Sequence, residues 1–127
     1  MKRFIGAIAV LTLVLVGSGG CYYDNEQTLY PSNGCDTANV KYSNQVTYIV
    51  SNKCYSCHSN ATAPLSGNGV SFEGYANISA YLAISGAFLP DIKQTVGSDP
   101  MPKNQPKLSD CEIRTIEIWI QNGYPNN

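Results

Sequence analysis

The sequence of 127 residues has few charged side chains and few histidines or methionines that could bind a metal. Charged residues make up 13% of the chain and give a net charge of −1, so the dense basic surface that nucleic-acid binding requires is missing. One histidine and two methionines allow every candidate ligand of these types to be considered individually. A hydrophobic content of 43% shows that the chain is not disordered over its whole length. The length allows a single domain.

The first 20 residues have the pattern of a secretory signal peptide. A basic start precedes an apolar stretch, Phe4–Val16, which is too short for a membrane span of about 20 residues. Small residues then lead to Cys21, at a place that resembles the processing site of bacterial lipoproteins, where the thiol receives a diacylglycerol. Because Ser18 stands where Leu or Val is usual, an ordinary signal peptidase cutting before Cys21 is the alternative. We expect residues 1–20 to be removed and the protein to be exported to the bacterial envelope.

The mature chain is predicted to consist of a tether and one domain. Residues 21–40 show no helical period and contain Pro31, Gly34 and several asparagines, so we expect a lipid anchor and tether there. The domain is expected over 41–127. We expect the protein to be a lipoprotein that either faces the periplasm or is anchored in the outer membrane.

The domain is predicted to be all-α, with a few short helices and irregular loops. A helix is expected from Ser43, as its N-cap, to Lys53, although the composition of residues 46–50 suits a strand equally well. The last helix has the clearest start, a capping box of Ser109 and Glu112. The other expected elements are helices over 75–84 and 90–97 and irregular loops over 59–74 and 98–108.

The segment Cys54-Tyr55-Ser56-Cys57-His58 carries the most specific chemical signal. C-x-x-C-H is the attachment sequence of a c-type haem. Two thiols three residues apart on a helical turn can form thioethers with two vinyl groups at one porphyrin edge. The adjacent imidazole of His58 can then ligate the iron.

Two other sites use the same motif. In a zinc site, His58 and either Cys111 or Cys35 would complete the ligand set, but the sequence has no second close pair of ligands. In a thioredoxin-like dithiol site the cysteines open a helix, with residues 46–50 as the preceding strand. The helix-hostile sequence from Asn60 to Gly69 disfavours such a helix.

Three segments together resemble small monohaem cytochromes c of bacterial envelopes, in a lipoprotein form. The resemblance covers about residues 41–127 and implies a cytochrome c-like, class I-like fold around one covalently bound haem c. It also implies that the first and last helices, here Ser43–Lys53 and Ser109–Asn122, cross beside the haem. The segments that carry it are CYSCH at 54–58, DPMPK at 99–103 and LSDCEIRTIEIWIQNG at 108–123.

The second axial ligand is assigned by elimination. His58 is the only histidine, and Met1 leaves with the signal peptide, so Met101 is the sole methionine of the mature protein. It stands between Pro100 and Pro102 in a polar loop with no core to fill. A thioether suits low-spin haem iron, so we expect Met101 to be the second axial ligand. The alternative is that Met101 is an ordinary methionine of the loop.

The five cysteines can all be assigned. Cys21 is expected to carry the lipid, and Cys54 and Cys57 the haem. The remaining two, Cys35 and Cys111, are expected to form a disulfide in an oxidising compartment, with two unpaired buried cysteines as the alternative.

The surroundings of the haem are predicted less specifically. We expect Pro64 or a neighbouring carbonyl to accept the Nδ1–H of His58, because metal-bound histidines usually have such a partner and the family usually places a proline carbonyl there. The candidates for the apolar wall are Leu65, Val70, Phe72, Tyr75, Leu82, Phe88, Ile92 and Trp119.

These patterns predict a single-electron carrier rather than an enzyme, acting with redox partner proteins of the envelope. It would be a monomer, held at the membrane by its N-terminal lipid, and would not bind nucleic acid. His58 and Met101 would be the axial ligands of the haem iron. The alternatives are a haem enzyme or gas sensor in which Met101 leaves the iron easily, and a non-haem dithiol oxidoreductase.

Overall fold

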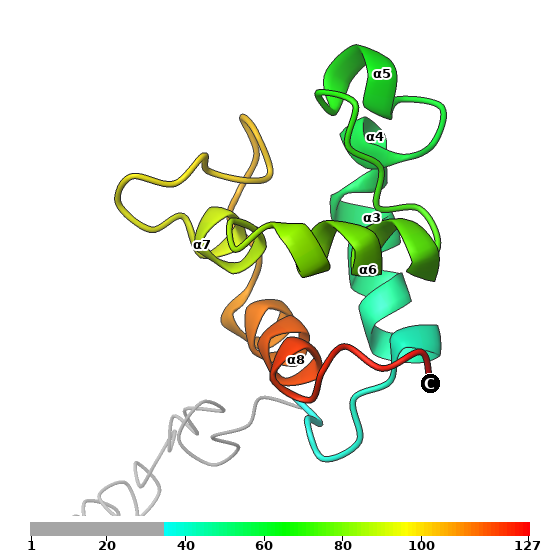
Figure 1. Cartoon of the computed structure of the whole chain (residues 1–127). Coiled ribbons are helices and arrows are strands. Elements are labelled where there is room, and N and C mark those ends of the chain that lie inside the picture. The colour runs from blue at the N-terminus through cyan, green and yellow to red at the C-terminus, as the bar shows by residue number, and fades with distance from the viewer. Residues whose placement is uncertain (1–34) are drawn as a thin grey trace, which may run out of the picture. The chain divides into compact units, whose positions relative to one another are not determined.

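The computed structural model describes residues 35–127. The predicted signal peptide, Cys21 and the first part of the predicted tether lie outside this range. Every regular element within it is helical (Figure 1), which confirms the predicted all-α class and excludes the strand considered for residues 46–50. No helix from Cys35 onward is long and apolar enough to cross a membrane.

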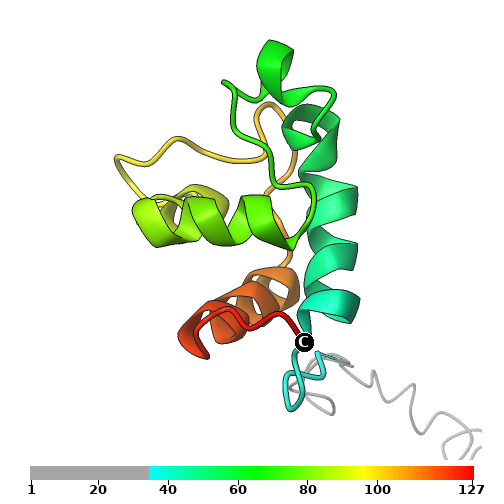
Figure 2. The ribbon, with the colours of Figure 1, turned by 45° about the vertical axis from the view of Figure 1, so that its right-hand side comes forward.

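A nearly continuous helical run begins the described chain. The π-helical turn η1 leads directly into α3, and α4 follows after Cys54 alone. Figure 2 shows α6 and α8 one above the other on the same side of this run, with α4 and α5 at its far end. The elements are η1 (Tyr42–Val46), α3 (Thr47–Lys53), α4 (Tyr55–His58), α5 (Ala63–Ser66), α6 (Tyr75–Ile84), α7 (Phe88–Lys93) and α8 (Asp110–Gln121).

The core is formed by the contact of α8 with η1 and by buried side chains of α3, α6 and α7. The indole of Trp119 stacks on the ring of Tyr42, with centroids 5.6 Å apart, and its Nε1–H donates to the Pro125 carbonyl at 2.9 Å. This bond satisfies the polar end of a large buried side chain. The largest fully buried side chains are Val46, Val50, Ile78, Ile116 and Trp119.

The C-terminal residue caps the first helical run. Asn127 accepts the Tyr42 N–H through its side-chain Oδ1 at 2.8 Å and the Ser43 N–H through its carbonyl at 2.9 Å. The prediction that Ser43 is the N-cap is therefore wrong, because the run begins at Tyr42 and the N-cap position is held by Lys41, two residues before Ser43. The first N–H groups are satisfied by a residue distant in sequence, so they need no local side-chain cap.

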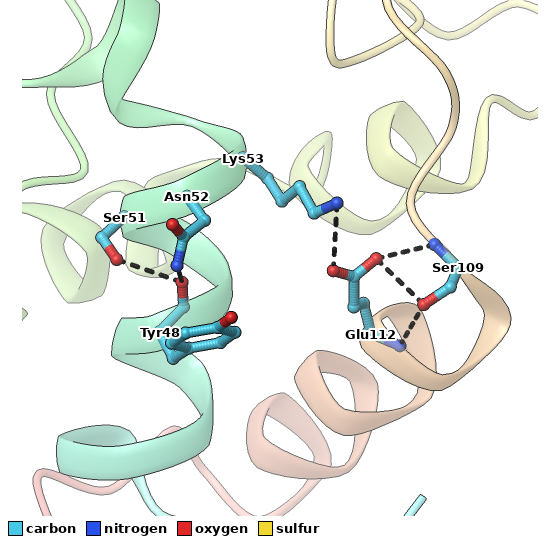
Figure 3. Close-up of polar contacts among 6 residues, drawn as sticks. All are labelled: Tyr48, Ser51, Asn52, Lys53, Ser109 and Glu112. Carbon is cyan, nitrogen blue, oxygen red and sulfur yellow. Dashed lines mark hydrogen bonds and ion pairs between the residues drawn. The ribbon is translucent and has the colours of Figure 1, made fainter. Parts of the chain in front are cut away.

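The predicted capping box of α8 is confirmed. The Ser109 hydroxyl accepts the Glu112 N–H at 3.2 Å, and the Glu112 carboxylate accepts the Ser109 N–H at 2.8 Å (Figure 3). The predicted bounds of α6, 75–84, are also confirmed.

The segment 59–74 contains one more helix than predicted. It includes α5, a single turn in which Pro64 lies at one of the first two positions. Proline is tolerated there because the first N–H groups of a helix have no partner within it. The rest of the segment is irregular, as expected.

The predicted helix over 90–97 is displaced toward the N-terminus. The observed helix, α7, begins at Phe88 and contains Pro90 in its first turn. It ends at Lys93, because Gln94 has a φ of +54° and leaves the helical conformation before Gly97 is reached.

The predicted disulfide is present in the structure. Cys35 and Cys111 are joined, with their Cα atoms 5.5 Å apart. The bridge links the first described residue to the first turn of α8. Val40 is buried in the core, so packed residues begin before Lys41, the expected start of the domain.

Replacing both Cys35 and Cys111 with Ser should lower the free energy of unfolding by about 4 kcal/mol, the chain-entropy value for a loop of this length. Denaturant unfolding of the oxidised protein checks this, and reductant should shift the wild-type midpoint but leave that of the double variant unchanged. Free alkylation of both thiols in protein matured in a bacterial envelope would contradict the bridge.

Candidate functional site

The C-x-x-C-H motif lies at the end of the first helical run. The N–H groups of Cys57 and His58 both donate to the Cys54 carbonyl, at 3.1 and 2.8 Å, so the motif forms one compact turn. Cys54 and Cys57 are the free cysteines of the described chain. Both thiols are therefore available for chemistry on the same turn.

A cavity of about 370 Å³ lies beside this turn. Its walls include Cys54, Cys57 and His58 on one element and Met101 on the loop between α7 and α8. The structure thus brings together the four residues that the sequence assigned to one site. The apolar part of the wall consists of Val70, Phe72, Tyr81, Phe88, Ile92 and Leu108.

His58 is held in a defined orientation. Its Nδ1 lies 2.8 Å from the Val70 carbonyl oxygen, and the ring of Phe72 stacks on the imidazole with centroids 4.7 Å apart. A carbonyl oxygen can only accept a hydrogen bond, so Nδ1 carries a proton in this contact, and in the neutral imidazole the free lone pair is then on Nε2. The predicted acceptor, Pro64, is therefore wrong. The acceptor is the carbonyl of Val70, six residues further along the chain, beyond α5.

Gly67 is a positioning residue that the sequence analysis did not identify. It is buried, and a Cβ atom there would clash with the Cys57 carbonyl oxygen and lie 3.0 Å from His58 Nδ1. Any side chain at this position would displace the motif turn or the imidazole. In the sequence, Gly67 was only one of several helix-hostile residues, so nothing local marked its close approach.

Four of the predicted wall residues do not line the cavity, namely Leu65, Tyr75, Leu82 and Trp119, and neither does Pro64. Leu65 is 92% exposed, whereas Trp119 is fully buried at the contact between α8 and η1. The Tyr75 hydroxyl donates to a carbonyl near the C-terminus, and Leu82 packs against the core. From α6, the cavity is instead lined by Tyr81, which the sequence analysis did not select.

Cys54 lies in an environment that disfavours a thiolate. Burial, followed by the negative charge of Glu112, raises its pKa from 9.0 to about 12. Thiol–disulfide oxidoreductases need a cysteine with a lowered pKa, which is nucleophilic near neutral pH. Cys54 stands between α3 and the short α4, and Cys57 lies within α4, so the two cysteines lie at the end of a helical run rather than at the start of a long helix. The geometry therefore does not support a dithiol redox site.

The ligand set considered for zinc is not assembled. Cys35 and Cys111, the two residues considered as a fourth ligand, are bonded to each other. Among residues 35–127, no group of three or more His, Cys, Asp or Glu side chains is placed to hold a metal ion.

Lys53 and Glu112 join α3 to α8 beside Cys54. Lys53 Nζ lies 3.3 Å from the Glu112 carboxylate, which also completes the capping box with Ser109 (Figure 3). Burial opposes the charge of Glu112, but the N–H and hydroxyl of Ser109 and the ammonium of Lys53 outweigh it. As a result the pKa of Glu112 is lower than its ordinary value of 4.5.

Comparisons with family models, with curated proteins and with solved structures found no match to this chain.

The Glu112 charge should make folding stability depend on pH in the acid range. Because its folded pKa is lowered, the charge stabilises the folded state above pH 4.5, and this contribution is lost as pH falls through the folded pKa. Glu112→Gln keeps a side chain that suits a capping box but removes the charge. The difference in unfolding free energy between wild type and this variant should therefore shrink from about pH 6 to about pH 3.

Denaturant titrations at several pH values measure this difference. Asp110→Asn is the matched control, because it removes a negative charge from the same helical turn without altering the box. A Glu112→Gln difference that stays constant across the acid range would contradict the stabilising role of the charge.

Proposed function

We propose that this chain is a single-electron carrier of the small c-type cytochrome class, with one covalently attached haem c. The observation that carries the proposal is the shared cavity. Cys54, Cys57 and His58 line it from the motif turn, both cysteines being free, and Met101 lines it from a separate loop. The electron-carrier function and the haem itself are inferred from this arrangement and from the motif.

The residues present fit a haem in their chemistry. Sulfur and imidazole nitrogen are common protein ligands of haem iron, and the wall is rich in aromatic and aliphatic side chains suited to a porphyrin face. Gly67 allows the chain to pass close beneath His58, so the imidazole is fixed without a bulky neighbour. Bound haem would supply reversible one-electron exchange between ferric and ferrous iron.

Each site residue has a distinct task in this proposal. Cys54 and Cys57 would add their S–H groups across the two vinyl double bonds, each forming one carbon–sulfur bond and transferring the hydrogen to the other vinyl carbon. His58 would present Nε2 to the iron while the Val70 carbonyl holds its Nδ1–H. Met101 would supply the second axial ligand. If His58 and Met101 both ligate the iron, no coordination position is left for a substrate or gas, which would favour a carrier over an enzyme or gas sensor.

The arrangement of the helices supports a cytochrome c-like fold for this carrier. The first helical run and α8 contact each other at η1, and the motif turn lies at the other end of that run. These are the two helices that the resemblance pairs beside the haem.

The envelope location is also part of the proposal. The Cys35–Cys111 disulfide is typical of exported proteins, since cytosolic thiols are kept reduced. The lipid anchor at Cys21, docking to redox partner proteins and the monomeric state accompany this proposal as expectations from the sequence.

Replacing Met101 with Ala should abolish the near-infrared sulfur-to-iron charge-transfer band of the ferric protein and lower its reduction potential, because a thioether raises the potential of haem iron. Absorption spectroscopy and a redox titration measure both effects. Val96→Ala is the matched control, since it shortens a fully exposed apolar side chain in the same loop and should change neither.

A band that survives in the Met101→Ala variant would show that Met101 is only a loop residue. A wild-type protein that is high-spin, or that binds carbon monoxide readily, would favour the haem enzyme or gas sensor. A protein without a Soret band would favour a site without haem.

A further inference from the structure

Met101 lies in a long loop without helices, residues 94–109, between α7 and α8. Loops of this length are uncommon in compact domains and need specific contacts to hold one conformation. Two of the contacts that hold this loop converge on one residue of α7. The Asp91 carbonyl accepts the Met101 N–H at 3.0 Å, and Asp91 Oδ1 accepts the Asp99 N–H at 3.0 Å.

Helix α7 is itself fixed to the rest of the domain. Phe88 and Ile92 are buried in the core, and Lys93 Nζ lies 2.6 Å from a carboxylate oxygen of Glu117 on α8. Asp91 stands in the middle of this helix and lines the same cavity as Met101. It is therefore a rigid point from which the loop can be held at the cavity.

We propose that Asp91 is the positioning residue of the second axial ligand, and that its carboxylate holds the loop at Asp99 so that Met101 stays at the wall of the cavity that it shares with His58. This proposal rests on the proposed function, because it assumes that Met101 ligates haem iron. Hydrogen bonds to a charged acceptor are stronger than neutral ones, so a single carboxylate can have a measurable effect on a loop with few other contacts.

Two further contacts act in the same loop and explain why the effect should be partial. The Gln94 side-chain amide donates to the Met101 carbonyl at 3.3 Å, and Lys103 pairs with the carboxylate of Asp99. The Met101 N–H bond to Asp91 uses a backbone carbonyl and persists in every variant. Loss of the Asp91 carboxylate should therefore leave the sulfur–iron bond able to form but easier to displace.

Imidazole competition in the ferric, haem-loaded protein tests the proposal. Asp91→Ala should raise the apparent affinity for added imidazole about tenfold, equivalent to about 1.4 kcal/mol, and weaken the sulfur-to-iron charge-transfer band at lower imidazole concentrations. Asp91→Asn keeps an oxygen that can accept the Asp99 N–H and should stay within about threefold of wild type. The matched control is Asp36→Ala, which removes an exposed aspartate whose Oδ1 likewise accepts a backbone N–H, that of Ala38 at 3.0 Å.

The outcomes separate the two proposals. A wild-type protein without the charge-transfer band would overturn Met101 ligation, and with it the proposed ligand set. If the band is present but Asp91→Ala behaves like Asp36→Ala, the role of Asp91 alone is overturned. If imidazole displaces Met101 as easily in Asp91→Asn as in Asp91→Ala, the hydrogen bond to Asp99 is not the means by which Asp91 holds the loop.

Amide hydrogen exchange of the wild-type holoprotein supplies a second test should Asp91→Ala fail to mature. The Asp99 amide should exchange more slowly than the amides of Lys103 and Asn104, which have no acceptor among the described residues. Equal exchange rates for all three would overturn the proposal.

Discussion

Trp119 is fully buried where α8 packs against the start of the first helical run, and this contact determines the geometry of the site. Asn127 strengthens the contact by accepting two N–H groups at the start of that run. Since η1 continues as α3 and then α4, fixing its start also fixes the direction in which the motif turn projects. The Lys53–Glu112 pair joins the first helical run to α8 at a second point, immediately before Cys54.

The two sides of the cavity are held by different physical means. On the His58 side, close packing dominates. Gly67 leaves no room for a side chain beside the Cys57 carbonyl and the imidazole. Phe72 stacks on the imidazole ring, and the Val70 carbonyl holds its Nδ1. On the Met101 side, a long loop is held mainly by individual hydrogen bonds and an ion pair. Close packing resists displacement more strongly than single hydrogen bonds do. If the proposed ligands are correct, the methionine is therefore the ligand that should leave first.

The elements with strong local signals could be predicted from the sequence, and those that depend on distant contacts could not. The capping box of α8 and the bounds of α6 follow from residues within each helix. The cap supplied by Asn127 could not be foreseen, because the residues that it caps, Tyr42 and Ser43, lie more than 80 residues earlier in the sequence. The disulfide could be predicted by elimination, because three of the five cysteines were assigned to other chemistry and only Cys35 and Cys111 remained to pair.

The sequence likewise indicated that the motif residues and Met101 belong to one site. It did not indicate which other side chains line the cavity that these residues share. Hydrophobicity indicates that a side chain is buried, not which cavity it faces. Trp119 was therefore assigned to the wrong side of the core and Tyr81 was overlooked. The acceptor for His58 depends on how the chain turns at α5, and proline spacing alone did not reveal that turn.

The central claim is that Cys54 and Cys57 hold a haem covalently. Its most direct test is intact-protein and peptide mass spectrometry of the full chain, expressed in bacteria with active haem-attachment machinery and compared with a Cys54→Ala, Cys57→Ala double variant. The denatured wild-type protein should carry the added mass of one haem, with thioether bonds on the peptide that contains both cysteines, and the double variant should carry none. An unmodified peptide from the wild-type protein, under conditions in which another c-type cytochrome matures, would contradict the claim.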